Sequence, residues 1–310
     1  MHELLDLSEI GDLGPTAVTV GVFDGVHLGH QHLISRLTQL AAEKSLTPVV
    51  IVVHPPPQTV LEGLECWTLL TSPAYRRDLL ERRGVDRVIP LEFTSQVAQI
   101  GALEFCEGLV QSIRMRLLVA GPDFALGHRR EGDMSRLAEI GRSLGFEVQP
   151  IEYFNLPERP ISSSEIRAAL GLGRVRDANS MIGREFQIVG RVAQGEKRGR
   201  LLGFPTANVV PERRQLMPRD GVYAVTVRCD GRSYGGVANL GVRPTFGASA
   251  RLLEVHLFDF AGDIYGENLA VAFVDSIRGE CQFAGIDELR SQITADVKTA
   301  RRILTARLTS

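Results

Sequence analysis

The sequence predicts an α/β fold with a doubly covered parallel sheet, followed by a small antiparallel β-barrel that ends in a helix. Three observations carry this prediction. Apolar strand segments alternate with amphipathic helical segments as far as about residue 170, which is typical of a parallel sheet covered on both faces. From residue 186 the pattern is strand-rich, with turn signals at Asp230-Gly231 and Gly235-Gly236. Residues 286–308 then repeat apolar positions at helical spacing.

The first half begins with a buried strand, a glycine-containing turn and a helix. Residues 18–23 form an apolar run, and residues 29–43 carry apolar positions at helical spacing. Together with the apolar run at 48–53, they predict a βαβ unit with a right-handed crossover. The alternation continues with helices near 75–83, 103–113 and 134–144, and with strands near 87–91, 117–120 and 146–151.

The second half begins where this alternation stops. A capped helix from Ser162 to about Leu170 and a short helical segment at 175–182 lead into the strand-rich part. We therefore expect two domains, residues 1–180 and residues 181–310. The strands predicted in the second domain are 186–192, 221–228, 233–240, 251–258 and 269–277. These strands and their turns indicate a closed antiparallel barrel, against which the last helix packs its apolar face.

Composition narrows the possible functions. The chain has 310 residues and a net charge of -2, so bulk charge predicts neither a nucleic-acid partner nor a membrane-surface partner. No apolar run is long enough to span a bilayer, the acidic N-terminus does not read as a signal peptide, and nothing indicates an oligomer. The four cysteines form no Cys-x-x-Cys pair, which predicts a reducing cytoplasm rather than disulfides or a zinc site.

The turn after the first strand is the strongest sign of chemistry. Its sequence is Gly21-Val-Phe-Asp-Gly-Val-His-Leu-Gly-His30, and it leads from a buried strand into a helix. The first amides of a helix lack intrahelical partners and the macrodipole is positive there, so this place suits a phosphate. His27 and His30 bring hydrogen-bond donors to it, unless they only make local bonds at the helix start. A metal is less expected, because no third ligand stands at a recognisable spacing.

Two further segments point to the same chemistry. Gly121-Pro-Asp-Phe-Ala-Leu-Gly127 also follows a strand, so it should reach the same edge of the sheet. In Ile161-Ser-Ser-Ser-Glu-Ile-Arg167, Ser162 and Glu165 match a capping box. The spare hydroxyls and the arginine would make a second phosphate clamp; the alternative is a capped surface helix. The usual P-loop and dinucleotide fingerprints are absent from the sequence.

These three segments, in this order, resemble the FMN adenylyltransferase domain of bifunctional riboflavin kinase/FAD synthetases. The resemblance implies a Rossmann-like nucleotidylyltransferase domain that joins FMN to ATP and releases pyrophosphate. It implies that His27 and His30 stabilise the charge on the phosphates and that Asp123 helps to place ATP or Mg²⁺. The nucleotide- and phosphate-binding positions that it implies are Gly21, Phe23, Asp24, Gly25, Asp123, Ser162, Ser164 and Arg167.

The second half resembles the riboflavin kinase domain of the same family. The segments that carry this resemblance are Leu202-Gly-Phe-Pro-Thr-Ala-Asn208, Gly221-Val-Tyr-Ala224, Asn239-Leu-Gly-Val-Arg-Pro-Thr-Phe246 and Glu254-Val-His256. The resemblance implies a six-stranded Greek-key barrel that phosphorylates riboflavin with ATP and Mg²⁺. Riboflavin, FMN and ATP would then be the substrates of the whole chain.

The same resemblance suggests roles for single residues of the barrel. Thr206 and Asn208 fall on the Mg²⁺ positions of the family, Gly203 falls on a phosphate-binding position, and Glu254 falls on the carboxylate that accepts the hydroxyl proton. From the pattern alone, Glu254 is either an exposed glutamate on a strand or a side chain in a pocket. The basic residues of the preceding loop would form a flap over the phosphates: Lys197, Arg198 and Arg200.

Two positions depart from the family pattern of the first domain. Leu126 stands where the family often has an aromatic residue, and Pro55-Pro-Pro57 replaces the usual Pro-His-Pro. These departures leave two alternatives beside the two-step enzyme. One is a riboflavin kinase with a weak or inactive adenylyltransferase domain, and the other is a non-catalytic protein that senses flavin or nucleotide. The set of residues that can handle phosphates argues against the sensor.

Overall fold

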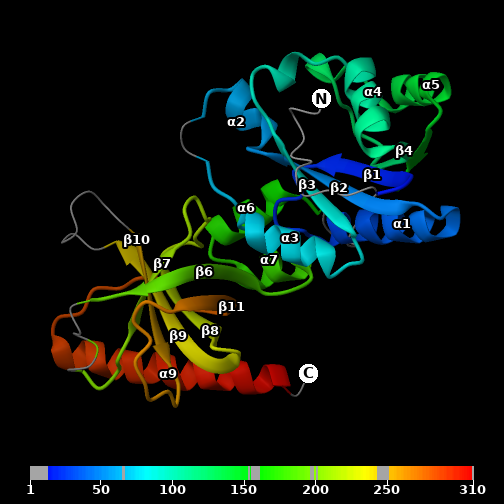
Figure 1. Cartoon of the computed structure of the whole chain (residues 1–310). Coiled ribbons are helices and arrows are strands. Elements are labelled where there is room, and N and C mark those ends of the chain that lie inside the picture. The colour runs from blue at the N-terminus through cyan, green and yellow to red at the C-terminus, as the bar shows by residue number, and fades with distance from the viewer. Residues whose placement is uncertain are drawn as a thin grey trace. The chain divides into compact units, whose positions relative to one another are not determined.

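The computed structural model describes residues 13–64, 67–152, 154, 161–195, 199, 202–242 and 251–308. The chain divides into two compact units (Figure 1). The first unit consists of Met1–Trp67 and Thr71–Ile161, and the second consists of Thr68–Leu70 and Ser162–Ser310. The functional boundary between residues 180 and 181 stays a prediction.

A five-stranded sheet forms the centre of the first unit. Its strands are β1 Thr16–Gly21, β2 Thr47–His54, β3 Arg87–Glu92, β4 Met115–Ala120 and β5 Glu147–Pro150. The strand order is β3-β2-β1-β4-β5, and all four neighbouring pairs are parallel. The direction of winding reverses between β1 and β4, so the segments that follow these two strands reach the same place at the carboxyl edge.

Helices cover both faces of this sheet. They are α1 Leu28–Lys44, α2 Pro57–Leu61, α3 Pro73–Glu81, α4 Ala102–Ile113 and α5 Met134–Leu144, with the 3₁₀ turns η1 Val97–Gln99 and η2 His128–Arg130. One core cluster joins the sheet to α1 and α3 and another joins it to α4 and α5, on the opposite side in Figure 1. The predicted strands and helices of this half are confirmed to within two residues, whereas α2 was not predicted.

The second unit is built on a closed six-stranded barrel. Its strands are β6 Phe186–Ala193, β7 Ala207–Pro211, β8 Gly221–Cys229, β9 Arg232–Val242, β10 Arg251–Leu257 and β11 Asn268–Arg278. The order around the barrel is β10-β7-β6-β11-β8-β9, and all six pairs are antiparallel. Five strands were predicted. The short strand β7 was missed because the Pro205-Thr-Ala-Asn208 run that leads into it has the composition of a turn.

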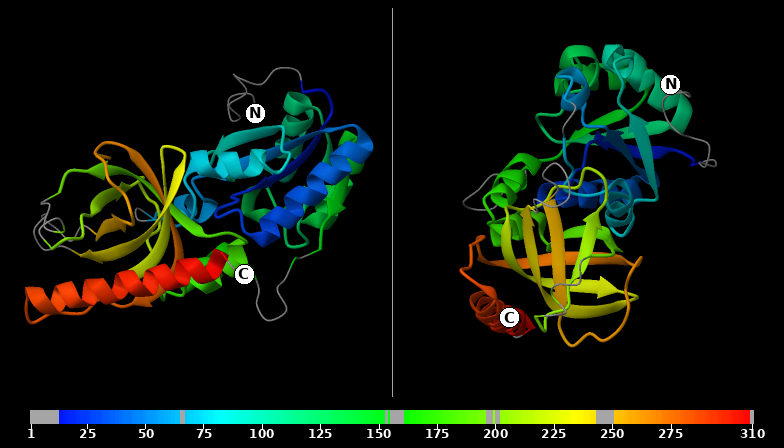
Figure 2. Two further views of the ribbon diagram at one scale, coloured as in Figure 1. Left: turned by 90° about the horizontal axis from the view of Figure 1, so that it is seen from below. Right: turned by 90° about the vertical axis from the view of Figure 1, so that its left-hand side faces the viewer.

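Among the described residues, the helices of the barrel unit include α6 Ser163–Gly171, α7 Val175–Ile182 and α9 Ile286–Leu308. The amide of Asn179 in α7 donates to the carbonyl of Phe273 at 2.9 Å and accepts from the amide of Phe186 at 2.7 Å. The helix α9 runs along the outside of the barrel, where Ala300 packs with Ala224 and Phe258 (Figure 2). The predicted last helix is confirmed.

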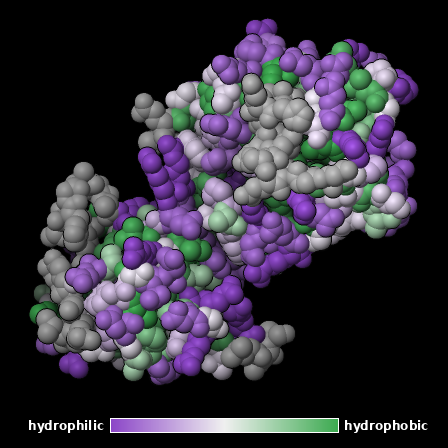
Figure 3. Space-filling model, in the orientation of Figure 1, coloured by the Kyte–Doolittle hydropathy of each residue, from purple (hydrophilic) through white to green (hydrophobic). Residues whose placement is uncertain are grey.

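Hydrophilic residues cover most of the described surface in the view of Figure 3, and hydrophobic residues form separate patches. Most apolar side chains of the strands are instead buried in the interior of each unit. Within the described parts of the chain, no helix combines the length and hydropathy that crossing a membrane requires.

Candidate functional site

The turn between β1 and α1 carries the first candidate site, and its backbone is strained. Phe23 and Val26 have φ angles of 52° and 40°, and Gly25 has 83°. Such left-handed conformations cost energy for residues other than glycine and persist where the surrounding structure holds them. The turn places His27 at the N-cap of α1, where its Nδ1 accepts a hydrogen bond from the amide of His30 at 3.3 Å. His27 therefore makes a local bond, beside a positive helix pole that suits a phosphate.

The ring of His30 lies against the rings of its two neighbours in the turn. It stacks on His27 with the ring centroids 3.6 Å apart and meets Phe23 edge to face at 5.1 Å. The Nδ1 atom of His30 is buried, and none of the described residues forms a hydrogen bond with it. A buried nitrogen without a partner is costly, so this atom points to a ligand that completes the site.

The environment of His30 keeps its ring neutral. Burial lowers the pKa of His30 well below its usual value, and the charges of His27 and Arg76 lower it further. A neutral imidazole donates one hydrogen bond and accepts another, rather than supplying a charge. At neutral pH, His30 can therefore donate a hydrogen bond to a phosphate oxygen, but it carries no positive charge that would attract the phosphate.

Lowering the pH is expected to destabilise the first unit through His30. Its pKa is lowered in the folded protein and is about 6.5 in the unfolded chain, so the unfolded chain takes up the proton first. The stability that neutral His30 contributes is thus present above about pH 6.5 and is lost as the pH falls below it. Denaturant unfolding from about pH 8 to about pH 5, followed by the fluorescence of the single tryptophan, Trp67, measures this loss. His30→Gln should show a shallower fall, and identical pH profiles would contradict the prediction.

A buried ion pair beneath the turn holds its conformation. Arg76 of α3 contacts Asp24 at 3.0 Å, and the two side chains are only 1% and 2% exposed. Asp24 also accepts a hydrogen bond from the amide of Thr71, and Arg76 donates to the carbonyl of Val22 at 2.7 Å. The hydroxyl of Thr71 accepts a hydrogen bond from the amide of Gly25. These contacts position the turn, and a contact of Asp24 with a nucleotide stays a prediction.

Arg76→Met is expected to lower the free energy of unfolding of the first unit by about 3–5 kcal/mol, because it leaves the carboxylate of Asp24 buried without its counterion. Denaturant unfolding followed by Trp67 fluorescence measures the change. Arg82→Met is the matched control, since Arg82 at the end of α3 pairs with Asp78 at 2.8 Å but is 66% exposed. The free energy of unfolding of Arg82→Met should fall by no more than about 1 kcal/mol. Equal losses in the two variants would show that the buried pair has no special role.

The loop after β4 reaches the same edge of the sheet as the turn after β1, because the two strands are neighbours. Asp123 is exposed in this loop, and its carbonyl accepts a hydrogen bond from Arg130 at 2.8 Å. Leu126, the departure from the family pattern, packs against the core cluster beneath α4. Gly127 has a φ of 81°, and an added Cβ would lie 2.5 Å from the amide nitrogen of Ala102. The loop is therefore anchored by packing, and the contact of Asp123 with ATP stays a prediction.

The serine-rich segment opens α6 as the capping box predicts. The hydroxyl of Ser162 accepts a hydrogen bond from the amide of Glu165 at 3.2 Å. Ser164 is exposed, and the half-buried Arg167 donates to the carbonyl of Thr68 at 3.4 Å. These residues belong to the second unit, and their binding of phosphates stays a prediction.

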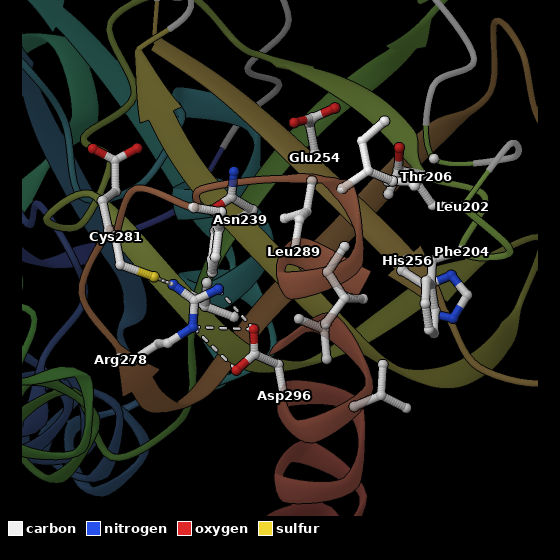
Figure 4. A pocket seen from close by; sticks show the side chains of 18 of the residues that line it. Leu202, Phe204, Thr206, Asn239, Glu254, His256, Arg278, Cys281, Leu289 and Asp296 are labelled. Carbon is white, nitrogen blue, oxygen red and sulfur yellow. Dashed lines mark hydrogen bonds and ion pairs between the residues drawn. The ribbon is translucent and has the colours of Figure 1, made fainter. Parts of the chain in front are cut away.

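The second candidate site is a cavity of about 1150 Å³ in the barrel unit (Figure 4). One wall comes from β8, β9 and β10, the facing wall comes from α9, and a third wall comes from the residues that follow β11. The polar lining includes Thr206, Asn239, Glu254 and His256, and α9 supplies the apolar residues Leu289, Ile293 and Val297. An apolar wall opposite a few polar groups is typical of a site for a small organic ligand.

Glu254 points from β10 into this cavity (Figure 4). Its neighbours Leu253 and Val255 are fully buried, and alternation along the strand turns Glu254 to the other face. Across the sheet it lies opposite Asn208 of β7 and Asn239 of β9. Residues that pair directly across strands share one face, so a carboxylate lies between two amides. Of the two interpretations that the sequence leaves open, the structure shows the side chain in a pocket.

The oxygens around Glu254 suit a small divalent cation. The Oδ1 atom of Asn208 is buried, and no hydrogen-bond partner for it exists among the described residues. Thr206, two positions earlier, lines the cavity. An added Cβ at Gly195 would come within 1.7 Å of Asn208 Nδ2, so glycine leaves room for this amide. Mg²⁺ prefers oxygen ligands, and the orphaned oxygen belongs to the residue that pairs with Glu254 across the strands, so these oxygens fit this ion. In the described part of the chain, no three His, Cys, Asp or Glu side chains cluster in a way that could hold a metal.

A second cavity of about 460 Å³ shares Thr206 with the first. The rest of its lining includes Val192, Leu257, Phe260, Ile264 and Tyr265. Gly203, in the loop that leads to Thr206, has a φ of 88°, which favours glycine. The predicted flap residues Lys197, Arg198 and Arg200 lie outside the described residues.

Sequence reasoning missed several residues of these cavities. In the second cavity, only Pro205, Thr206 and Ala207 belong to a sequence motif, and the other lining residues carry none. Arg278 and Asp296, which line the first cavity, also lie outside every motif. One signal could have found Asp296. It stands three residues after Ile293 and four before Ala300, so it is a charged residue within the apolar stripe of the predicted helix.

Comparison with known proteins identifies the family. The riboflavin kinase family model matches residues 182–304, and the FAD synthetase family model matches residues 10–165. The bifunctional riboflavin kinase/FMN adenylyltransferase of Pseudomonas fluorescens is 40% identical, and the match covers 92% of each chain. The protein of the same name from Escherichia coli K12 is 39% identical, over 92% of this chain and 91% of its own.

A solved structure supports the fold over nearly the whole length. It is described as a macrolide-efflux protein from Streptococcus pneumoniae, is 33% identical, and has a TM-score of 0.87 over 95% of this chain and 96% of its own. That description belongs to the other protein, whereas both halves of this chain match flavin-enzyme models in the order predicted. The chain belongs to the bifunctional riboflavin kinase/FMN adenylyltransferase family.

Proposed function

We propose that the chain makes FAD from riboflavin in two steps, with ATP as co-substrate of each. The C-terminal domain, which contains the barrel, phosphorylates riboflavin to FMN, and the N-terminal domain, which contains the parallel sheet, joins FMN to the adenylyl group of a second ATP. The observation that carries this proposal is that the two halves of the chain match two different enzyme family models, and that a bifunctional relative matches over 92% of both chains. We assign the two activities to residues 181–310 and residues 1–180.

The geometry of the barrel supports a direct transfer of phosphate. In the proposal the flavin ring lies in the larger cavity against the apolar side of α9, and ATP lies in the smaller cavity. Thr206 lines both cavities, so the γ-phosphate and the 5′-hydroxyl of riboflavin would meet beside it. Glu254 accepts the hydroxyl proton while the oxygen bonds to the γ-phosphorus and ADP leaves.

The remaining barrel residues handle charge. Thr206 and the orphaned oxygen of Asn208 would hold Mg²⁺, and Gly203 would bring backbone close to the phosphates. The ion would neutralise negative charge on the phosphate oxygens. Alignment and charge stabilisation account for most of the catalysis in such transfers.

The first unit needs no side-chain nucleophile, because the attacking group is already an anion. A phosphate oxygen of FMN bonds to the α-phosphorus of ATP, and pyrophosphate leaves. His27 and His30 would donate hydrogen bonds to phosphate oxygens at the helix pole. The other proposed phosphate and nucleotide contacts are Gly21, Phe23, Asp24, Gly25, Asp123, Ser162, Ser164 and Arg167. The proposal also includes a cytoplasmic location and neither a nucleic-acid nor a membrane partner.

A flavin product assay tests the two-step function. The protein is incubated with riboflavin, ATP and Mg²⁺, and the flavins are separated over time; a parallel reaction starts from FMN. FMN should appear first and FAD should follow, and FMN alone should also give FAD. Accumulation of FMN without FAD in both reactions would leave only the kinase. Flavin binding without any turnover would favour the sensor.

A further inference from the structure

Residues 279–283 form the third wall of the larger cavity without a helix or strand of their own. Four of them line the cavity: Glu280, Cys281, Gln282 and Phe283. An added Cβ at Gly241 would come within 2.1 Å of the Glu280 carboxylate, so this side chain lies over β9. A wall that no backbone ladder holds depends on side-chain contacts for its position.

Arg278, the last residue of β11, ties this point of the chain to α9 (Figure 4). Its Nε lies 3.1 Å from both carboxylate oxygens of Asp296, and its Nη2 donates to Oδ2 at 2.8 Å. The side chains are 22% and 4% exposed, so the pair is largely withdrawn from water. Gln292, one turn earlier in α9, donates to Asp296 Oδ1 at 2.9 Å. The hydrogen bond from Gln292 therefore helps to fix the orientation in which the carboxylate of Asp296 faces the guanidinium of Arg278.

The same guanidinium contacts both ends of the 279–283 wall. Its Nη1 donates to the carbonyl of Gly279 at 3.0 Å and lies 3.0 Å from Cys281 Sγ. Its central carbon lies 5.7 Å from the centre of the Phe283 ring. A planar guanidinium presents several donors in fixed directions, whereas the ammonium group of lysine is a point charge on a flexible stem. One side chain thus orders the wall and fixes it to the apolar wall from α9.

We propose that the Arg278–Asp296 pair is a positioning pair that holds the 279–283 wall against α9 and thereby sets the affinity of the cavity for riboflavin. This inference rests on the proposed kinase function of the barrel unit. Neither residue of the pair lines the smaller cavity, and its hydrogen bonds with described residues go to Gly279, Cys281 and Gln292. The pair is therefore expected to act on flavin binding rather than on ATP binding or on proton transfer.

Arg278→Lys tests the pair in the full chain, because lysine keeps the positive charge but lacks the planar guanidinium with its several donors. The KM for riboflavin, and the Kd measured by quenching of riboflavin fluorescence, should each rise on the order of tenfold. The kcat at saturating riboflavin and the KM for ATP should stay within about twofold of wild type. Asp296→Asn should have the same effect, and the double variant should add little to either single change, because both remove one interaction.

Arg301→Gln is the matched control. Arg301 also joins α9 to the barrel side, through both oxygens of Asp259 at 2.9 and 3.0 Å, but this exposed pair does not line the cavity. The Arg301→Gln variant should therefore have the same KM for riboflavin as the wild-type protein. An unchanged riboflavin Kd in Arg278→Lys, or equal rises in the KM values for riboflavin and ATP, would overturn the inference. A wild-type protein that binds riboflavin without phosphorylating it would refute the kinase function instead, and the Kd comparison would still test the pair.

Discussion

Glu254→Gln is expected to slow riboflavin phosphorylation by about 10²–10⁴-fold, because it removes the carboxylate that accepts the hydroxyl proton. The change is nearly isosteric, so the side chain keeps its place between Asn208 and Asn239. Glutamine still offers an oxygen to the hydroxyl but takes up no proton. The loss should therefore fall mainly on kcat, while the KM for riboflavin changes little.

The rate of FMN formation under saturating ATP and Mg²⁺ measures this effect. FAD formation from added FMN provides an internal control in the same protein, since it should continue at the wild-type rate. Glu267→Gln is the matched variant, because Glu267 is exposed and lies outside the lining of both cavities. A Glu254→Gln protein that phosphorylates riboflavin at the original rate would show that another group accepts the proton.

His30→Ala is expected to slow FAD formation from FMN by about 10²–10³-fold, the usual cost of losing one preorganised hydrogen-bond donor to a developing charge. The buried Nδ1 of His30 has no partner among the described residues, and the ring is held between His27 and Phe23. A neutral ring in a fixed place needs little reorganisation when charge grows on the phosphates.

Riboflavin phosphorylation should remain at the wild-type rate in His30→Ala, because the proposed kinase residues lie in the barrel. His32→Ala provides the comparison within α1, since the His32 ring contacts Phe154 rather than the turn. Trp67 fluorescence shows whether the first unit of each variant is folded. Equal loss of both reactions would contradict separate sites, and an unchanged rate of FAD formation would remove His30 from the mechanism.

Local periodicity in the sequence was enough to predict most of the architecture. Apolar runs and helical spacing placed β1 and α1 within two residues, and the Ser-x-x-Glu pattern placed the start of α6. These signals lie within a few neighbouring residues, which is the range over which backbone hydrogen bonding and side-chain direction are decided. The strand β7 escaped because it is short and because its partners across the barrel, β6 and β10, hold it in place.

For the candidate sites too, the sequence pointed to single residues, whereas the structure showed how they are arranged. The local pattern after the first strand pointed to His27 and His30, whereas Thr206, Asn208 and Glu254 were proposed only from the resemblance of their segments to the family. Neither signal showed that Glu254 faces a cavity with α9 as its other wall. That arrangement requires the barrel to close and the last helix to pack along it, which brings together residues distant in the sequence.

By itself, the sequence determined the order of the elements, the family and the motif residues of two proposed reactions. Only the tertiary structure decided how those residues are held. Arg76 reaches Asp24 across 52 positions, and Arg278 reaches Asp296 across 18. The apolar stripe of the last helix marks Asp296 as unusual, but no periodic pattern names the partner of either residue, because a buried charge finds its partner through the packing of whole elements. The physical reason is that secondary structure follows short-range preferences, whereas the shape and charge of a site depend on long-range contacts.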